Sequence, residues 1–181
     1  DPVNDAPVNS VPATQTVIEE TTTAIPGVSI ADVDDNGGLV MTRLQVSNGA
    51  LNVTLSGGAI IAGGSNDSVD IYLQGTVTDI NNTLASLTYT GSTDVYGTNA
   101  DTVTVTTSDG GNTGSGGTLL DVDSFQINIT NVNDAPIITG GPATGSLTET
   151  DAALTDSGTL TVGDADTADV VTASVESVAV T

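Results

Sequence analysis

The side chains of this chain that could do chemistry are almost all carboxylates. Its 181 residues include 23 Asp and Glu, a single basic residue, Arg43, and no His or Cys, so the formal net charge is −22. Without His or Cys there is no Ser–His or Cys–His nucleophile. Oxygen ligands without imidazole or thiolate suit Ca²⁺ or Mg²⁺ and not zinc or copper. The composition therefore predicts binding of a hard cation and gives little support to catalysis.

The acids and their amide neighbours fall in short clusters. These clusters are Asn4-Asp5, Glu19-Glu20, Asp32-Val33-Asp34-Asp35, Asp101, Asn133-Asp134 and Asp164-Ala165-Asp166. Most lie where a predicted strand begins or ends, so in a sandwich they would gather at its two ends. Ca²⁺ takes about six to eight oxygens, more than one cluster offers. We therefore expect clusters from different segments to converge, whereas Asp109, in a glycine-rich turn, is not expected to be a calcium ligand.

One of these clusters occurs twice in the same surroundings. The stretch VNDAP appears around Asp5 and again around Asp134, 129 residues later. Asp34 follows Asp5 by 29 residues, and Asp164 follows Asp134 by 30. Matching spacing from two Asn-Asp steps favours a repeated structural unit.

Other interpretations of the same acids remain open. DVDDNG at 32–37 matches the first half of an EF-hand loop, but the twelfth position is Arg43 in place of the bidentate Glu, which makes an EF-hand improbable. Asp and Asn also cap ordinary turns by bonding their own backbone. Residue types alone leave a carboxylate pair for glycoside hydrolysis open, yet the chain has only four aromatic residues to stack on a sugar.

The remaining sequence is typical of β-structure. Short runs alternate apolar with polar residues and are rich in Thr, Val and Ile. The clearest of them cover 51–55, 68–73, 102–107 and 123–130. Turn residues such as those in DGGNTGSGG at 109–117 separate the runs. We predict an all-β, Greek-key β-sandwich.

One segment departs from this alternation. Ile80, Leu84 and Leu87 follow helical spacing behind Thr78, an expected N-cap. A short helical turn is therefore predicted between two strands.

The predicted organisation has four parts. Residues 1–10 are expected to be a linker, 11–130 the sandwich, 131–136 a calcium-binding linker, and 137–181 an incomplete second β unit. No stretch of about 18 apolar residues is present, so no membrane span is expected. The strong negative charge argues against nucleic acid as a partner.

These stretches resemble a known family. IADVDDNGG, LASLTYTG, DTVTVTTSDGGNTGSGG and INITNVNDAP are together similar to the cadherin-like repeats of giant bacterial surface adhesins. VNDAP resembles the linker of those repeats. The tail SLTETDAALTDSGTLTVGDADTADVVTASV resembles the start of a VCBS-type repeat of the same class of adhesin.

The resemblance implies calcium at the junctions between repeats. Carried over residue by residue, one junction would use Glu19, Glu20, Asp101, Asn133, Asp134, Asp164 and Asp166. A junction with a preceding repeat would use Asn4, Asp5, Asp32 and Asp34. The sequence departs from the family in having Asn131 where the linker usually has Asp, and it lacks a recognisable LDRE motif.

The expected function is a non-enzymatic, Ca²⁺-stiffened spacer on a bacterial cell surface, which serves in adhesion or biofilm formation. Its partners would be neighbouring repeats of the same chain. Two alternatives stay open: a module that binds surface polysaccharide, and a filament subunit completed by strand addition from another copy.

Overall fold

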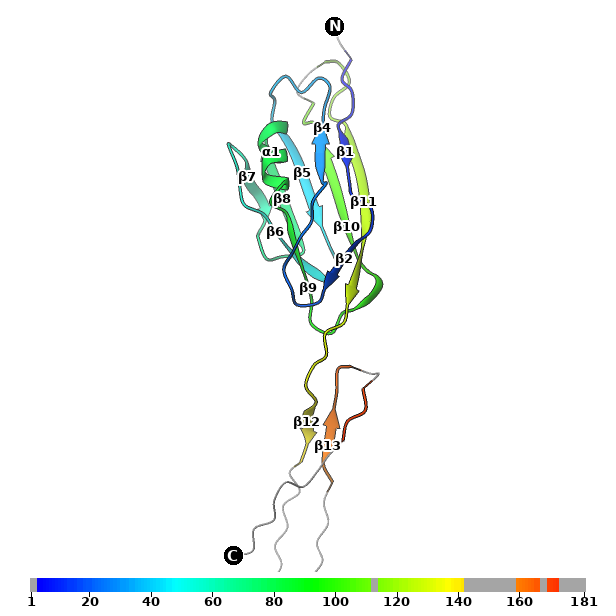
Figure 1. Ribbon diagram of the computed structural model, residues 1–181. Helices are drawn as coiled ribbons and strands as arrows, with labels where there is room; N and C mark the ends of the chain where they lie inside the picture. Colours follow the sequence, from blue (N-terminus) through cyan, green and yellow to red (C-terminus); the bar gives the residue numbers. More distant parts are fainter. Residues whose placement is uncertain (1–2, 112–113, 142–158, 167–168, 173–181) are drawn as a thin grey trace, which may run out of the picture. The chain divides into compact units, whose positions relative to one another are not determined.

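The computed structural model describes residues 3–111, 114–141, 159–166 and 169–172. The chain divides into two compact units, unit 1 from Asp1 to Val132 and unit 2 from Asn133 to Thr181 (Figure 1). Each unit is described by itself.

Unit 1 is a β-sandwich, as the alternating pattern predicts. Its six-stranded sheet has the spatial order β2 (Gln15–Ile18), β11 (Leu120–Thr130), β10 (Gly97–Ser108), β5 (Val40–Gln45), β8 (Asp70–Gly75) and β7 (Ile60–Gly64). The facing layer contains β3 (Thr23–Ala24), β9 (Thr88–Gly91) and β6 (Gly49–Asn52), and a separate pair of β1 (Val8–Ser10) with β4 (Ser29–Ala31). All neighbours are antiparallel except β2 and β11, which run parallel.

The core lies between the layers and is almost wholly aliphatic. Every second residue is buried throughout β8 and, in β10, from Asp101 onward, because successive side chains of a strand point to opposite faces. Tyr89 and Phe125 are the only buried aromatic residues in the described part of the chain. Small hydroxyl and aliphatic side chains therefore fill the remaining space.

The helix is present, but its N-cap lies two residues before the predicted one. Helix α1 spans Val77–Leu84, and its N-cap is Thr76, whose hydroxyl accepts a hydrogen bond from Asp79 N at 3.2 Å. The Thr76 hydroxyl also donates to Asp79 Oδ2 at 2.9 Å. The expectation for Thr78 is therefore wrong, because the acid three residues after Thr76 completes a reciprocal cap there. The buried positions Ile80 and Leu84 are as predicted.

The first boundary also differs from the expected one. Residues 1–10 were expected to be a linker, yet Val8–Ser10 form strand β1, which pairs with β4 in unit 1. The apolar and polar alternation in so short a strand is too brief to be seen in the sequence. The end of unit 1 at Val132 lies two residues beyond the expected end at Thr130.

Two strands are described in unit 2. Strands β12 (Ile137–Gly140) and β13 (Thr161–Gly163) pair antiparallel, with Ile137 opposite Gly163. Within the VCBS-like stretch, 146–175, residues 146–158, 167–168 and 173–175 lie outside the described residues.

Candidate metal sites at the ends of the units

The linker acid and the Asp-x-Asp step come together at the N-terminal end of unit 1. Asp5 N donates to Asp34 Oδ2 at 3.1 Å, and Asp34 N donates to Asp32 Oδ1 at 3.1 Å. The loop that carries Asp32 and Asp34 joins two strands, since β4 ends at Ala31 and β5 begins at Val40. No helix flanks this loop, so the EF-hand interpretation is wrong. Asp5, Asp32 and Asp34 are thus neighbours linked by backbone amide donors, and their role as metal ligands stays a prediction.

Asn4 belongs to the same end but has a protein partner. Its Nδ2 donates to Asp109 Oδ2 at 2.5 Å and to the carbonyl oxygen of Gly117 at 2.9 Å. Asp109 Oδ1 accepts from Gly111 N at 2.8 Å and from Leu119 N at 2.9 Å. Asp109 therefore has a structural role. Its side chain is 3% exposed, and its hydrogen bonds connect the glycine-rich loop to the N-terminal segment.

The charges at this end affect one another. Burial raises the pKa of Asp32 above its ordinary value, and the negative charges of Asp34 and Asp109 raise it further. Burial alone would raise the pKa of Asp109, but its hydrogen bonds from Leu119, Asn4 and Gly111 outweigh burial and lower it. Asp109 is thus stabilised as an anion by protein donors, whereas Asp32 is an anion that its surroundings disfavour.

Unit 2 begins with the same arrangement. Asp134 N donates to Asp166 Oδ2 at 2.5 Å, and Asp166 N donates to Asp164 Oδ1 at 3.0 Å. Asp166 is 4% exposed. This arrangement equates Asp166 with Asp34, so the sequence comparison paired the wrong residues when it set Asp164 against Asp34. The corrected separations from the linker acid are 29 residues in unit 1 and 32 in unit 2.

The strands around these acids correspond as well. In unit 1 the first strand begins at Val8, three residues after Asp5, and pairs with Ala31, the residue before Asp32. In unit 2 the equivalent pair is Ile137 with Gly163, the residue before Asp164. The two units therefore start with one structural pattern in one register.

The predicted ligands of the C-terminal end of unit 1 lie after β2. Glu19 is 1% exposed, and its Oε1 accepts a hydrogen bond from Val132 N at 2.6 Å. Its other oxygen, Oε2, is buried and has no hydrogen-bond partner within the described part of the chain. Glu20 has a positive φ of 55°, and its Oε1 accepts from the Thr93 hydroxyl at 2.6 Å. Glu19 is thus a buried carboxylate with only one of its oxygens satisfied.

Asp101, expected as a ligand, is used by the fold. Its Oδ1 accepts from Ser47 N at 2.9 Å and from Thr102 N at 2.7 Å. Its Oδ2 accepts from Asn48 N and from the Tyr89 hydroxyl, both at 2.9 Å. Burial and the adjacent Asp101 carboxylate raise the pKa of Tyr89, so its hydroxyl remains a donor. Four donors therefore occupy the acceptor sites of Asp101, and its carboxylate holds together segments of unit 1.

Asn133 is the remaining predicted ligand, and it is exposed. Its Nδ2 donates to the carbonyl oxygen of Asp134 at 3.1 Å. The side-chain oxygen of Asn133 is an amide oxygen of the kind that can coordinate Ca²⁺.

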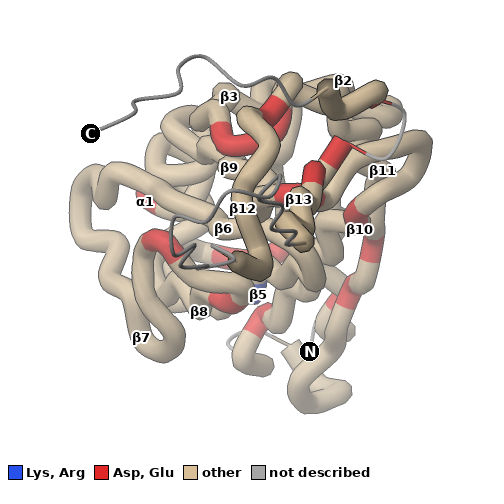
Figure 2. Tube along the Cα trace, turned by 90° about the horizontal axis from the view of Figure 1, so that it is seen from below, with Lys and Arg blue, Asp and Glu red and all other residues tan. Residues whose placement is uncertain are grey.

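Figure 2 shows acidic segments on the loops around β3 and β9 of unit 1. A hollow of about 580 Å³ lies there, lined by Glu20, Gly49, Ala50, Thr90, Gly91, Ser92 and Thr93. Its lining offers hydroxyls and one carboxylate but no aromatic ring. Among the described residues, no three acidic side chains already form a compact metal-binding group. Any ion would therefore have to draw the acids of an end closer together or use other oxygens.

The comparisons leave the family open. No family model matches the chain, and searches of the curated proteins and of the solved structures return no significant match. The described helix is too short to cross a membrane.

Proposed function

We propose that the chain is a non-enzymatic segment of an extracellular bacterial adhesin in which Ca²⁺ binds at the ends of successive β units and stiffens them into a spacer. The observation that supports a bound metal ion is the state of the Glu19 carboxylate. Its Oε2 is buried without a hydrogen-bond partner in the described part of the chain. The cadherin-like resemblance supplies the adhesin and its cell-surface location.

The argument for a cation is energetic. An ionised carboxylate that is buried without compensation is costly, and buried charges in proteins are as a rule paired or bound to a metal. The sole basic residue, Arg43, is already paired with Asp70. A hard divalent ion is therefore the compensation that best fits Glu19, and Ca²⁺ suits irregular carboxylate sites better than Mg²⁺ does.

Each unit contributes its own acids to the proposal. At the C-terminal end of unit 1 the ligands would be Glu19 and Glu20, and at its N-terminal end Asp5, Asp32 and Asp34, with the Asn4 side-chain oxygen. At the start of unit 2 they would be Asn133, Asp134, Asp164 and Asp166. The ion would supply neutralisation of these carboxylates and no reaction.

The chain's connectivity links this metal to stiffness. Glu19 accepts a hydrogen bond from Val132, and Asn133 and Asp134 follow Val132 directly in sequence. An ion bound by Glu19 would therefore act beside the segment that joins the two units. In this proposal, Ca²⁺ restrains that segment, and its removal leaves like charges to repel.

A calcium titration of thermal unfolding tests the proposal. Because Ca²⁺ would bind the folded chain only, millimolar Ca²⁺ should raise the melting temperature of the wild type above its value in EDTA, and Mg²⁺ should do so much less. Glu19→Gln should lose most of this increase. Without metal it should melt no lower than the wild type, because a buried charge has been removed.

The matched control is Asp123→Asn. Asp123 lies on β11, seven residues before Thr130, the last residue of the strand. It is therefore about 24 Å along the strand from the end of unit 1 that carries Glu19. The substitution removes the same charge as Glu19→Gln does. It should keep the full calcium effect. Identical melting curves in EDTA and Ca²⁺ would reject the metal, and equal losses in both variants would mean that the acids act only through net charge.

A further inference from the structure

The outer face of the six-stranded sheet carries two neighbouring rows of side chains, one across five strands and the other across four. Paired residues in neighbouring strands point to the same face. The first row is Ile60, Gln74, Met41, Ser108 and Leu120 on β7, β8, β5, β10 and β11. The second is Tyr72, Arg43, Thr106 and Val122 on β8, β5, β10 and β11.

These rows are unusually apolar for an outer face. Ile60, Met41, Leu120 and Val122 are 51, 38, 61 and 58% exposed. Single exposed aliphatic residues are ordinary, but several of them on one sheet face, here alternating with Gln74 and Ser108, favour an interaction surface. In unit 1 the strands place these four residues within two adjacent rows.

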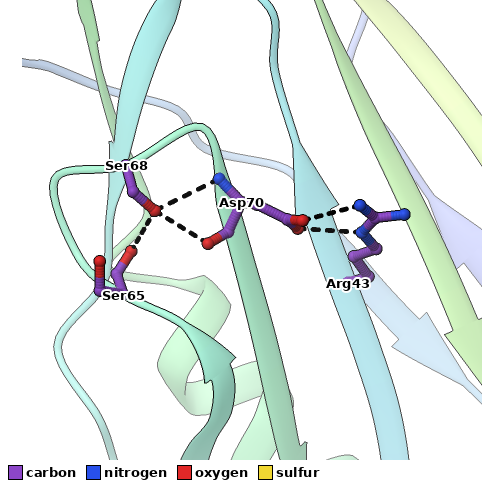
Figure 3. Close-up of polar contacts among 4 residues, drawn as sticks. All are labelled: Arg43, Ser65, Ser68 and Asp70. Atoms are coloured by element: carbon purple, nitrogen blue, oxygen red, sulfur yellow. Dashed lines mark hydrogen bonds and ion pairs between the residues drawn. The ribbon is translucent and has the colours of Figure 1, made fainter.

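The same face is electrically balanced. On the outward positions of β5, β7, β8, β10 and β11 the charged side chains are Arg43 and Asp70. Figure 3 shows their bidentate pair, with Arg43 Nε 2.9 Å from Asp70 Oδ1 and Nη2 2.7 Å from Oδ2. The guanidinium also lies 4.9 Å from the centre of the Tyr72 ring. Asp121 and Asp123 are paired with Thr107 and Val105, so they belong to the opposite face.

The Asp70 partner is held in place by its loop. The Ser68 hydroxyl donates to the carbonyl oxygens of Ser65 at 2.7 Å and Asp70 at 2.9 Å (Figure 3). The only positive charge of the chain is therefore fixed on the sheet and neutralised there, and the outer face is left with no net charge.

We propose that this face is a self-association surface on which a second copy of the chain docks, face to face, about a two-fold axis. The charge of the chain favours a second copy as the partner on this face. Because the net charge is −22, two copies repel each other wherever acids are exposed. This face has no net charge and is rich in apolar side chains, so two copies can approach each other there. A two-fold contact presents the same patch from both copies, so the aliphatic rows of one copy cover those of the other. The proposal does not depend on calcium.

The size of the patch sets the expected strength. Five strands span about 19 Å between the outermost two, and the four outward positions of β10 from Thr102 to Ser108 span about 20 Å. This footprint is on the order of 400 Å² per copy, below the roughly 800 Å² of a standard interface. The association should therefore be weak, reversible and dependent on concentration.

Sedimentation equilibrium of the full chain tests the proposal, with enough salt to screen the net charge. The wild type should show a reversible monomer–dimer equilibrium as its concentration rises. Leu120→Asp places a charge in the first row and should weaken dimerisation by about tenfold or more, equivalent to about 1.4 kcal/mol. Leu55→Asp is the matched control, because Leu55 is 44% exposed in the loop after β6, away from this face.

Val122→Glu provides an independent variant in the second row and should weaken the dimer as Leu120→Asp does. Melting curves like that of the wild type establish that each variant is folded. A chain that stays monomeric at every concentration would overturn the proposal. So would a dimer that survives both substitutions, or one that Leu55→Asp weakens equally.

Discussion

Glu19 and Asp109 are both buried carboxylates of unit 1, but they differ in how many hydrogen-bond donors surround them. Asp109 receives donors on both oxygens, whereas Glu19 has one buried oxygen without a hydrogen bond in the described part of the chain. The sequence analysis assigned a ligand role to Glu19 and none to Asp109. The Asp-Gly-Gly turn could have indicated the hydrogen-bonding role of Asp109, since Asp in turns commonly accepts hydrogen bonds from the backbone amides that follow it.

We expect Asp109→Asn to destabilise unit 1 by about 1–3 kcal/mol at neutral pH, because an amide nitrogen would replace an oxygen among donors. The lowered pKa of Asp109 adds an acid signature. Its stabilisation is present above the unfolded pKa near 3.8 and is lost as pH falls through the lower folded pKa. Wild type and variant should therefore converge in stability on acidification, as denaturant unfolding across pH would measure. A constant difference at all pH values would contradict this role.

Asp101 allows a second test, which distinguishes a carboxylate that stabilises the fold from one that binds calcium. Asp101→Asn should destabilise unit 1 by about 1–3 kcal/mol, because its oxygens accept from three backbone amides and a tyrosine hydroxyl. The increase in melting temperature caused by Ca²⁺ should nevertheless persist. If calcium stabilisation disappears while the folded structure remains, Asp101 is a ligand as the family resemblance implied.

At the scale of single residues, the sequence predicted a partial site. The sequence singled out Asp5, Asp32 and Asp34, which backbone amide hydrogen bonds link in the structure, while their role as metal ligands stays a prediction. It could not show that Asp101 is enclosed by donors, because those come from Ser47, Asn48 and Tyr89, far away in sequence. Burial of this kind is a property of the fold and leaves no local pattern.

At the scale of elements, the cap of α1 offers a paired test. Thr76→Ala should cost about 1 kcal/mol, because it removes the hydroxyl that caps the helix. Thr78→Ala should change stability little, since Thr78 is exposed within the helix. Chemical denaturation of the two variants compares them directly, and equal losses would contradict the assigned cap.

The helix and the strands also show why boundaries were harder to predict than elements. The apolar spacing of Ile80 and Leu84 identified the helix, but two threonines competed for its cap. Strand β1 was missed because three residues carry too little alternation. The matching registers of β1–β4 and β12–β13 could not be predicted, because each register is a pairing between two strands that lie far apart in sequence.

At the scale of the whole molecule, the separation into two units predicts independent folding of the first. A chain ending at Pro136 should retain one cooperative unfolding transition with nearly the wild-type midpoint for unit 1, because the core residues of unit 1 precede Val132. Calorimetry of the shortened and full chains measures this. Unfolding of unit 1 on truncation would mean that residues after Pro136 belong to its core.

The sandwich itself was predictable at this scale, because period-two alternation and glycine-rich turns recur through unit 1. The pairing of its first and last strands was not, since nothing local in Gln15–Ile18 indicates that it lies parallel to β11.

That parallel pairing has a mechanical consequence. The N-terminal segment and the C-terminal end of β11 lie at opposite ends of unit 1 (Figure 1). Strand β2 runs beside β11 over four residue pairs, from Gln15–Ile127 to Ile18–Thr130. Tension applied between the two ends would pull these strands past each other along their length. The ladder would then be loaded in shear, with its hydrogen bonds sharing the force, instead of being peeled apart one bond at a time.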